Sequence, residues 1–121
     1  MENKFVAVVG CGTWGRNIVR NFYNLNVLHS VCDIDRENLA AVVSQYKNVK
    51  TTGDFKEILN NSEIKAVCVV TPSHTHFPLV KAALEAGKHV YVEKPISTIA
   101  RLLLLKKGVS KINKESKIKL I

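Results

Sequence analysis

A glycine-rich stretch, GCGTWG at residues 10–15, joins two segments whose apolar residues follow different periods. The segment before it, Lys4–Val9, is almost continuously apolar and leads into a glycine, which is typical of a strand buried on both faces. In the segment after it, apolar residues recur at helical spacing at Trp14, Ile18, Phe22 and Leu25. The stretch therefore predicts a tight turn from a central strand into a helix over Thr13–Leu25.

The same alternation of strand-like and helix-like segments continues along the whole chain. Further strands are predicted at Val27–Cys32, Val49–Thr51, Ala66–Val70, His89–Val92 and Lys117–Ile121. Further helices are predicted after Asp35, after Asp54, over residues 75–86 and over Ile99–Lys114, and Asp54 and Glu57 have the spacing of a capping box. This order predicts an α/β fold, a doubly wound parallel sheet (Rossmann fold) of about six strands with helices on both faces.

Length and composition are those of one globular domain over residues 1–121. Hydrophobic residues make up 46% of the chain and charged residues 23%. No apolar run approaches the roughly 20 residues of a membrane span, and the first residues enter a strand pattern without a secretory signal. The three cysteines, Cys11, Cys32 and Cys68, form no CxxC pair. We therefore expect a cytoplasmic protein with reduced thiols, no membrane association and no metal site.

The net charge of +8 raises the question of nucleic-acid binding. From residue 101 onward the chain has seven basic residues and one acidic residue, whereas the first 100 residues have eleven basic and nine acidic residues. The excess charge therefore belongs to one terminal segment, and that segment has no aromatic side chain on which a base could stack. We expect no nucleic-acid partner.

The setting of the glycine-rich stretch, after a buried strand and before a helix, predicts a dinucleotide site. Gly10 permits the tight turn, Gly12 lets the backbone approach a pyrophosphate, and Gly15 lets the helix pack close to the strand. Thr13 and Trp14 lie at the start of that helix, where unpaired N–H groups and partial positive charge favour phosphate groups.

Asp33 ends the second predicted strand, 18 residues after Gly15, where a dinucleotide fingerprint requires an acid. Its carboxylate could accept hydrogen bonds from the adenosine ribose hydroxyls and would repel a 2′-phosphate by about 4 kcal/mol at about 4 Å and an effective dielectric constant of about 20. The sequence thus favours NAD over NADP. Arg36 keeps NADP open, because it is close enough to bind a phosphate if Asp33 turns away.

A second polar loop, TPSHTH at residues 71–76, follows the fourth predicted strand. In a doubly wound sheet the ligand lies beyond the carboxyl ends of the strands, so this loop should adjoin the dinucleotide. We expect Thr71 and Pro72 to line its cleft. Of the two histidines, His76 is the preferred candidate for a role in the site and His74 the weaker one.

The chain resembles the Gfo/Idh/MocA family, which includes glucose–fructose oxidoreductase and inositol dehydrogenase. The resemblance covers about residues 4–97 and rests on VAVVGCGTWG, Asp33, TPSHTH and AALEAGKHVYVEKP, the last being the most specific. It implies that Lys94 lies beside the nicotinamide, with Glu93 and Pro95 in the same cofactor loop, and helps to bind and polarise a substrate hydroxyl.

The resemblance also implies an activity: NAD-dependent oxidation of a hydroxyl of a sugar, polyol or nucleotide sugar, with the nucleotide-sugar branch the most similar. Family members carry a second α/β domain that supplies substrate contacts and an Asp/His pair. We expect residues 1–121 to lack that domain, to be truncated and catalytically incomplete alone, and to meet the substrate only if the domain is supplied. A non-catalytic NAD(H)-binding sensor or assembly module is the alternative.

An oligomer is a further expectation from the last predicted helix. Leu103 and Leu104 fall outside its main apolar stripe and would be exposed. An exposed apolar patch of this kind favours self-association, so a homodimer or larger assembly is predicted.

Overall fold

A computed structural model describes residues 4–92 and the backbone of residues 118–120. The predicted helix over Ile99–Lys114, with Leu103 and Leu104, lies outside these residues, as do Glu93, Lys94 and Pro95. Among the helices of the described part, none is long and apolar enough to cross a membrane.

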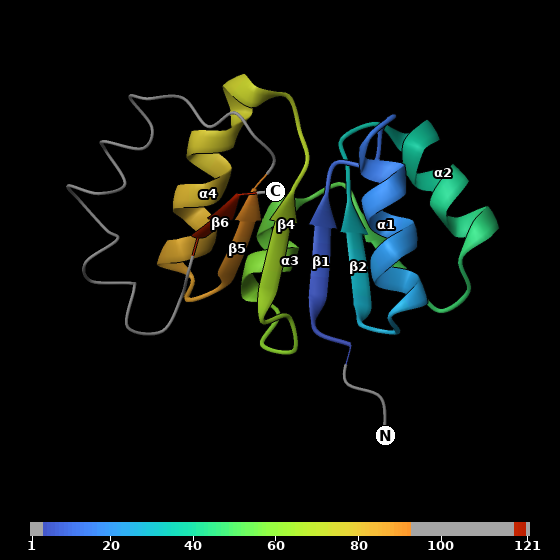
Figure 1. Cartoon of the computed structure of the whole chain (residues 1–121), viewed down its shortest axis with the longest axis horizontal. Helices are drawn as coiled ribbons and strands as arrows, with labels where there is room; N and C mark the ends of the chain where they lie inside the picture. Colours follow the sequence, from blue (N-terminus) through green and yellow to red (C-terminus); the bar gives the residue numbers. More distant parts are fainter. Residues whose placement is uncertain (1–3, 93–117, 121) are drawn as a thin grey trace.

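The strands of the described residues form one parallel sheet of six (Figure 1). They are β1 (Val6–Val9), β2 (Leu28–Cys32), β3 (Lys50–Thr52), β4 (Ala66–Val69), β5 (His89–Val92) and β6 (Ile118–Leu120). Their order across the sheet is β3-β2-β1-β4-β5-β6, which confirms the predicted doubly wound fold. The order reverses between β1 and β4, so a ligand cleft is expected where those two strands end.

Helices cover both faces of the sheet, as predicted. They are α1 (Gly15–Asn24), α2 (Arg36–Gln45), α3 (Phe55–Asn60) and α4 (His76–Glu85), and a short 3-10 helix, η1 (Ser73–Thr75), precedes α4. Because successive residues of a strand point to opposite faces, Val8 packs with residues of α1 and α2, whereas Val9 packs with residues of α3 and α4.

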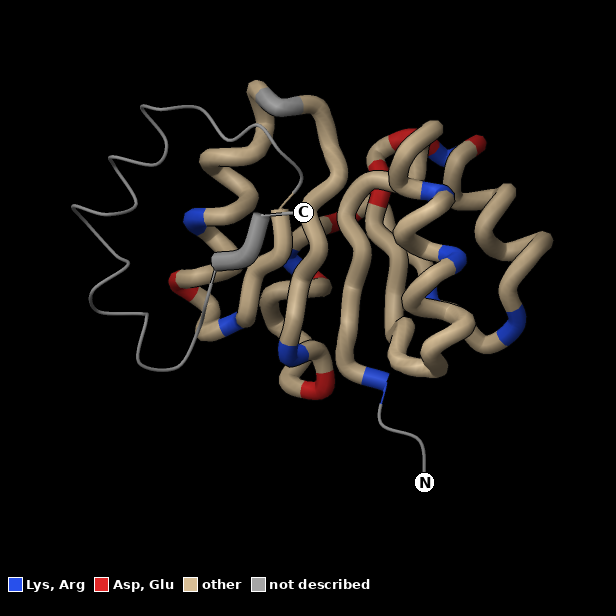
Figure 2. Tube along the Cα trace, in the orientation of Figure 1, with Lys and Arg blue, Asp and Glu red and all other residues tan. Residues whose placement is uncertain are grey.

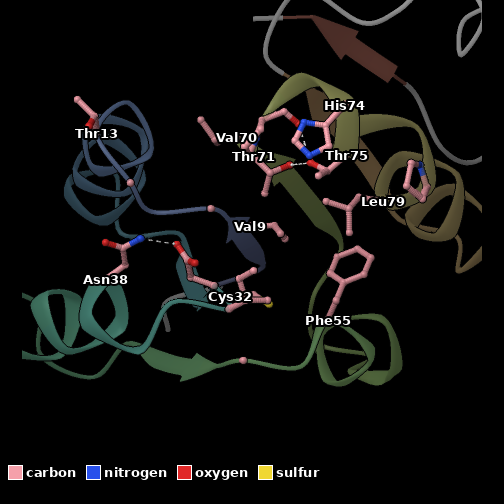
Figure 3. A pocket seen from close by; sticks show the side chains of 17 residues that line it. Val9, Thr13, Cys32, Asn38, Phe55, Val70, Thr71, His74, Thr75 and Leu79 are labelled. Carbon is pink, nitrogen blue, oxygen red and sulfur yellow. Dashed lines mark hydrogen bonds between the residues drawn. The ribbon is translucent and has the colours of Figure 1, made fainter.

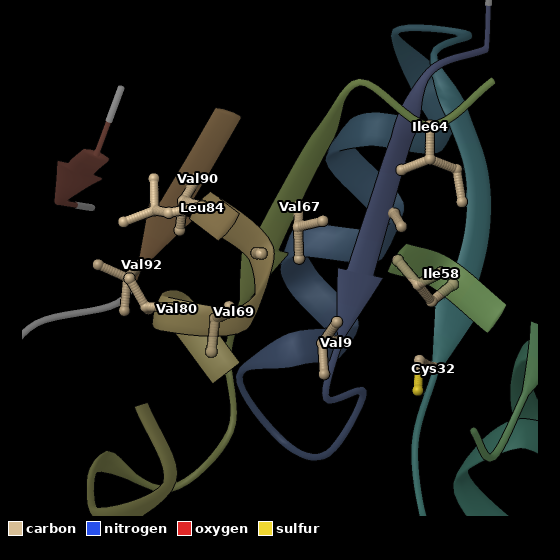
Figure 4. Packing of buried hydrophobic residues seen from close by; sticks show 12 residues of the cluster. Val9, Cys32, Ile58, Ile64, Val67, Val69, Val80, Leu84, Val90 and Val92 are labelled. Atoms are coloured by element: carbon tan, nitrogen blue, oxygen red, sulfur yellow. The ribbon is translucent and has the colours of Figure 1, made fainter. Parts of the chain in front are cut away.

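The core under α3 and α4 packs against β4 and β5 (Figure 4). Val67, Val69, Val90 and Val92 of β4 and β5 pack there against Val80 of α4, and all five side chains are fully buried. A sheet buried in this way on both faces is a rigid frame, and it presents the carboxyl ends of its strands together at one edge.

Aspartates start two of the helices. Asp35 caps α2 by accepting a hydrogen bond from Glu37 N at 2.9 Å, and Asp54 caps α3 by accepting one from Lys56 N at 3.0 Å. The second hydrogen bond of a capping box, from the Asp54 N–H to the Glu57 carboxylate, does not form, because the Asp54 N–H donates to Thr52 instead. The Thr52 hydroxyl accepts from Asp54 N at 3.0 Å and donates to Glu57 Oε1 at 2.9 Å, so it stands between the two residues.

Lys88 is buried at the end of the sheet opposite the carboxyl edge, immediately before β5, and sequence patterns gave no sign of it. Its side chain is 6% exposed, and its Nζ donates to the carbonyl oxygens of Asn61 at 2.8 Å and Ile64 at 2.7 Å. Burial, with a further contribution from the positive charge of Lys65, lowers the pKa of Lys88 below its ordinary value of 10.5. The amine thus ties the α3–β4 loop to β5.

We expect the Lys88→Met variant to lose about 2 kcal/mol of unfolding free energy, because two carbonyl groups lose their donor. This loss should grow with pH. Between the lowered pKa of the folded protein and 10.5, the unfolded chain binds more protons than the folded one, so the contribution of Lys88 to stability rises with pH and levels off above 10.5. Urea unfolding of both proteins from pH 8 to pH 11 measures the difference, and a difference that stays constant contradicts the prediction.

Candidate functional site

Two glycines of the turn after β1 are required by close backbone contacts. Gly10 has a φ of +99°, and a Cβ on it would lie 2.8 Å from the carbonyl oxygen of Val70. A Cβ on Gly15 would overlap the carbonyl oxygen of Gly10. Gly10 therefore brings the turn against β4, and Gly15 brings α1 against the turn, as the sequence predicted.

Gly12 differs from both, since a Cβ on it would meet no atom of the described residues within 4 Å. It lies where the backbone passes into α1, and its carbonyl accepts the first hydrogen bond, from Arg16 N at 3.0 Å. The N–H groups of Gly12 and Thr13 donate to no acceptor in the described part of the chain. Open space beside free N–H groups at a helix N-terminus is a surface that fits a phosphate anion.

A cleft of about 800 Å³ opens at the carboxyl ends of β1 to β4, beside this turn (Figure 3). Its walls include six of the site residues that the sequence predicted. These are Gly10, Gly12, Thr13, Asp33, Thr71 and Pro72. The turn, the end of β2 and the loop after β4 thus meet around one cavity.

The Asp33 carboxylate is held in place by four hydrogen bonds. Oδ2 accepts from Cys11 N at 3.0 Å, from Cys11 Sγ at 3.4 Å and from Asn38 Nδ2 at 3.1 Å, whereas Oδ1 accepts from Asp35 N at 2.9 Å. Burial alone would raise the pKa of Asp33, yet the hydrogen bonds from Asp35, Cys11 and Asn38 together lower it below the ordinary value. The group is therefore a fixed negative charge at neutral pH.

The same contact makes Cys11 unreactive. Burial and the neighbouring Asp33 carboxylate raise the pKa of the Cys11 thiol to about 12, and burial raises that of Cys32 to about 11. Both thiols, like that of Cys68, are buried and form no disulfide within the described residues. No group of three or more His, Cys, Asp or Glu side chains among the described residues could hold a metal ion.

The loop after β4 is fixed by its own side chains. Thr75 Oγ1 lies 2.6 Å from Thr71 Oγ1 and 2.7 Å from the carbonyl oxygen of Pro72. His76 Nε2 donates to the carbonyl oxygen of Thr71 at 2.7 Å. The His76 ring is only 2% exposed, and its Nδ1 has no hydrogen-bond partner within the described residues.

Several predicted site residues do not line the cleft. Trp14, Gly15, Arg36 and His76 are absent from its walls, and Glu93, Lys94 and Pro95 lie outside the described residues. His74, the weaker of the two histidine candidates, lines the cleft and is exposed, whereas His76 is buried behind the loop. A role of these residues in binding stays a prediction.

Sequence reasoning missed other wall residues, including Asn38, Phe55 and Leu79. Each lies in the first turns of a helix that begins beside the cleft: α2, α3 and α4. The order of strands and helices could have predicted them. A helix that follows a strand of a parallel sheet starts at the carboxyl edge of the sheet, so its first turn faces the ligand.

These features together define a dinucleotide-binding domain of the doubly wound type, with a glycine turn after β1 and an acid after β2. The groups present fit a dinucleotide, since open amide groups and a fixed carboxylate line the same cleft. The chain belongs to the Gfo/Idh/MocA family, described as an oxidoreductase family with an NAD-binding Rossmann fold, whose pattern matches residues 4–118.

Individual relatives agree with this family. Uncharacterized oxidoreductase YdgJ of Escherichia coli (strain K12) is 45% identical over 56 residues, which are 46% of this chain and 16% of that protein. Inositol 2-dehydrogenase of Serratia proteamaculans (strain 568) is 32% identical over 100 residues, with 79% of this chain and 30% of that protein covered. The chain spans less than a third of the length of either relative.

Among solved structures, the WlbA dehydrogenase from Chromobacterium violaceum, in complex with NADH and UDP-GlcNAcA, superposes with a TM-score of 0.85. The two sequences are 26% identical, and the match covers 100% of this chain and 35% of the WlbA chain. The likeness therefore concerns the dinucleotide-binding part of such proteins.

Proposed function

We propose that the cleft binds NAD, with the pyrophosphate at the backbone of Gly12 and the adenosine ribose at Asp33. The observation that carries the proposal is that open backbone at Gly12 and the fixed carboxylate of Asp33 line the same cleft. The pyrophosphate requires close approach to the backbone, and the ribose requires an acceptor for its hydroxyl hydrogens. The membership of an NAD-binding family supports the same ligand.

NAD is preferred over NADP because the ribose end of the cleft is acidic. Asp33, Asp35 and Glu37 follow one another at the end of β2 and the start of α2, where Figure 2 shows acidic positions gathered. A 2′-phosphate beside Asp33 would meet a like charge that the lowered pKa keeps ionised. Arg36 is the opposing cation, and it is exposed and absent from the cleft walls.

For the whole protein we propose the oxidation of a hydroxyl of a sugar, polyol or nucleotide sugar. Support comes from relatives, one of them named for inositol and another solved with NADH and UDP-GlcNAcA. Bound NAD supplies the hydride acceptor for such a reaction. Lys94, in the EKP sequence, would stabilise negative charge on the substrate oxygen, with Glu93 and Pro95 beside it. The part of this activity that the described cleft would perform is dinucleotide binding.

Titration of the wild-type chain with NADH and NADPH tests both parts of the binding proposal. Binding can be followed by energy transfer to NADH from Trp14, the sole tryptophan of the sequence, which is 52% exposed in the glycine-rich turn. Asp33→Ala should weaken NADH binding and relieve the repulsion of a 2′-phosphate. We expect the NADH-to-NADPH affinity ratio to fall at least tenfold.

The matched control is Asp35→Asn, which removes a neighbouring negative charge at a position outside the cleft walls and keeps a helix-capping side chain. This variant should change the ratio by less than about threefold. Absence of NADH binding by the wild type rejects the NAD site as a whole. Binding with an unchanged ratio in Asp33→Ala rejects only the assignment of Asp33.

A further inference from the structure

Asn38 lies in the first turn of α2 and lines the same cleft as Asp33. It is half-buried, and its Nδ2 donates to Asp33 Oδ2 at 3.1 Å (Figure 3). The neighbouring contact of Asp35 N with Asp33 Oδ1 fixes the start of α2 against the same carboxylate. The Asn38 amide is therefore held at the ribose end of the cleft before any ligand arrives.

The hydrogen bonds of Asp33 leave little room for a ligand. A carboxylate has about four acceptor sites, two on each oxygen. Three donors already point at Oδ2, namely Cys11 N, Cys11 Sγ and Asn38 Nδ2, and Asp35 N occupies one site on Oδ1. About one site remains, on Oδ1. A ribose presents two neighbouring hydroxyls, so Asp33 can accept from one of them and the second needs another partner.

The orientation of the Asn38 amide follows from chemistry. An ionised carboxylate only accepts hydrogen bonds, so the amide must turn its nitrogen toward Asp33 and its oxygen away, as Figure 3 shows. The second N–H of the Asn38 side-chain amide and its Oδ1 then have no hydrogen-bond partner among residues 4–92 and 118–120. A hydroxyl both donates and accepts, so it can bond to either group.

We propose that Asp33 and Asn38 together recognise the vicinal diol of the adenosine ribose. Asp33 Oδ1 accepts from one hydroxyl, and the Asn38 amide hydrogen-bonds the other. This inference rests on the proposed NAD site and adds to it a residue that sets specificity. Asn38 is a binding residue with a neutral side chain, so its effect concerns the ribose hydroxyls and not the charge of the cleft.

The test is calorimetric titration with three ligands: NAD and its analogues that lack the 2′- or the 3′-hydroxyl of the adenosine ribose. In the wild type, loss of either hydroxyl should weaken binding three- to tenfold. Asn38→Leu should weaken NAD binding by a similar factor. In this variant, one of the two analogues should bind as tightly as NAD, because Asn38, the partner of its missing hydroxyl, is already gone. The other analogue should still bind three- to tenfold more weakly than NAD.

The outcomes separate this inference from the proposed function. Suppose that loss of each hydroxyl weakens binding by the same factor in the wild type and in Asn38→Leu, or that both factors fall in the variant. Either result would overturn the role of Asn38 and leave the proposed NAD site unaffected. Failure of the wild type to bind NAD overturns both. Asn21→Leu, on the exposed side of α1, is the control and should behave as the wild type. Asn38→Ala gives the same readout should the leucine variant fail to fold.

Discussion

Replacing Gly12 with valine is expected to weaken NADH binding more than a hundredfold and to leave the fold intact. A Cβ at this position meets no atom of residues 4–92 within 4 Å, so this part of the fold has room for the new side chain. That room is the space in which we place the pyrophosphate, and a branched side chain would keep the phosphates away from the free N–H groups of Gly12 and Thr13. Loss of several charge-assisted hydrogen bonds explains the size of the effect.

The measurement is the Trp14-to-NADH energy transfer titration, with urea unfolding on the same samples. Gly12→Ala provides a graded control, because its single methyl group should reduce affinity less than valine does. The unfolding free energy should stay within about 0.5 kcal/mol of the wild type in both variants. Unchanged NADH affinity in Gly12→Val would show that the pyrophosphate does not bind at this turn, whichever ligand the cleft binds.

The features that sequence predicted correctly are those set by short-range patterns. The sequence predicted the six strands, their parallel arrangement and the α/β class from three patterns. These are the continuous apolar run, the spacing of the glycines, and the alternation of strand-like and helix-like periods. The position of Asp33 in the cleft wall followed from its spacing after the glycine turn, because the turn follows β1, Asp33 follows β2, and the ends of these two strands lie side by side. Its role in binding a ribose stays a prediction. The ends of the helices differed by one or two residues, since helix termini depend on local capping contacts.

The features that sequence missed depend on where a side chain turns after the chain has folded. The orientation of His76 is one example, since its ring turns inward to the carbonyl of Thr71, whereas a role of this residue in the site stays a prediction. The sequence analysis made no prediction for Lys88, and the loop before β4 supplies the two carbonyl oxygens to which its buried Nζ donates. Such contacts join residues that are distant in sequence, so no local spacing indicates them.

Gly15→Ala is expected to destabilise the domain by about 3 kcal/mol or more. The added Cβ would overlap the carbonyl oxygen of Gly10 and lie 2.8 Å from its carbonyl carbon. Gly10 cannot move away, because its N–H donates to Cys32 O at 2.8 Å and its own Cα position lies against Val70. The first turn of α1 must therefore move off the sheet, which loosens the packing of the buried Val19.

The sign of the change in unfolding free energy shows whether the close contact at Gly15 or the helix propensity of alanine dominates. Alanine stabilises a helix by about 1 kcal/mol relative to glycine when nothing hinders it, so an unhindered Gly15→Ala would gain stability. Gly53→Ala is the matched control, because its Cβ would lie 3.6 Å from Asp33 O, an ordinary van der Waals contact, and we expect a change within about 0.5 kcal/mol. Urea unfolding followed by circular dichroism measures both variants. A Gly15→Ala protein as stable as the wild type would show that α1 does not need its close approach to the β1 turn, and the geometry proposed for the phosphates would lose its support.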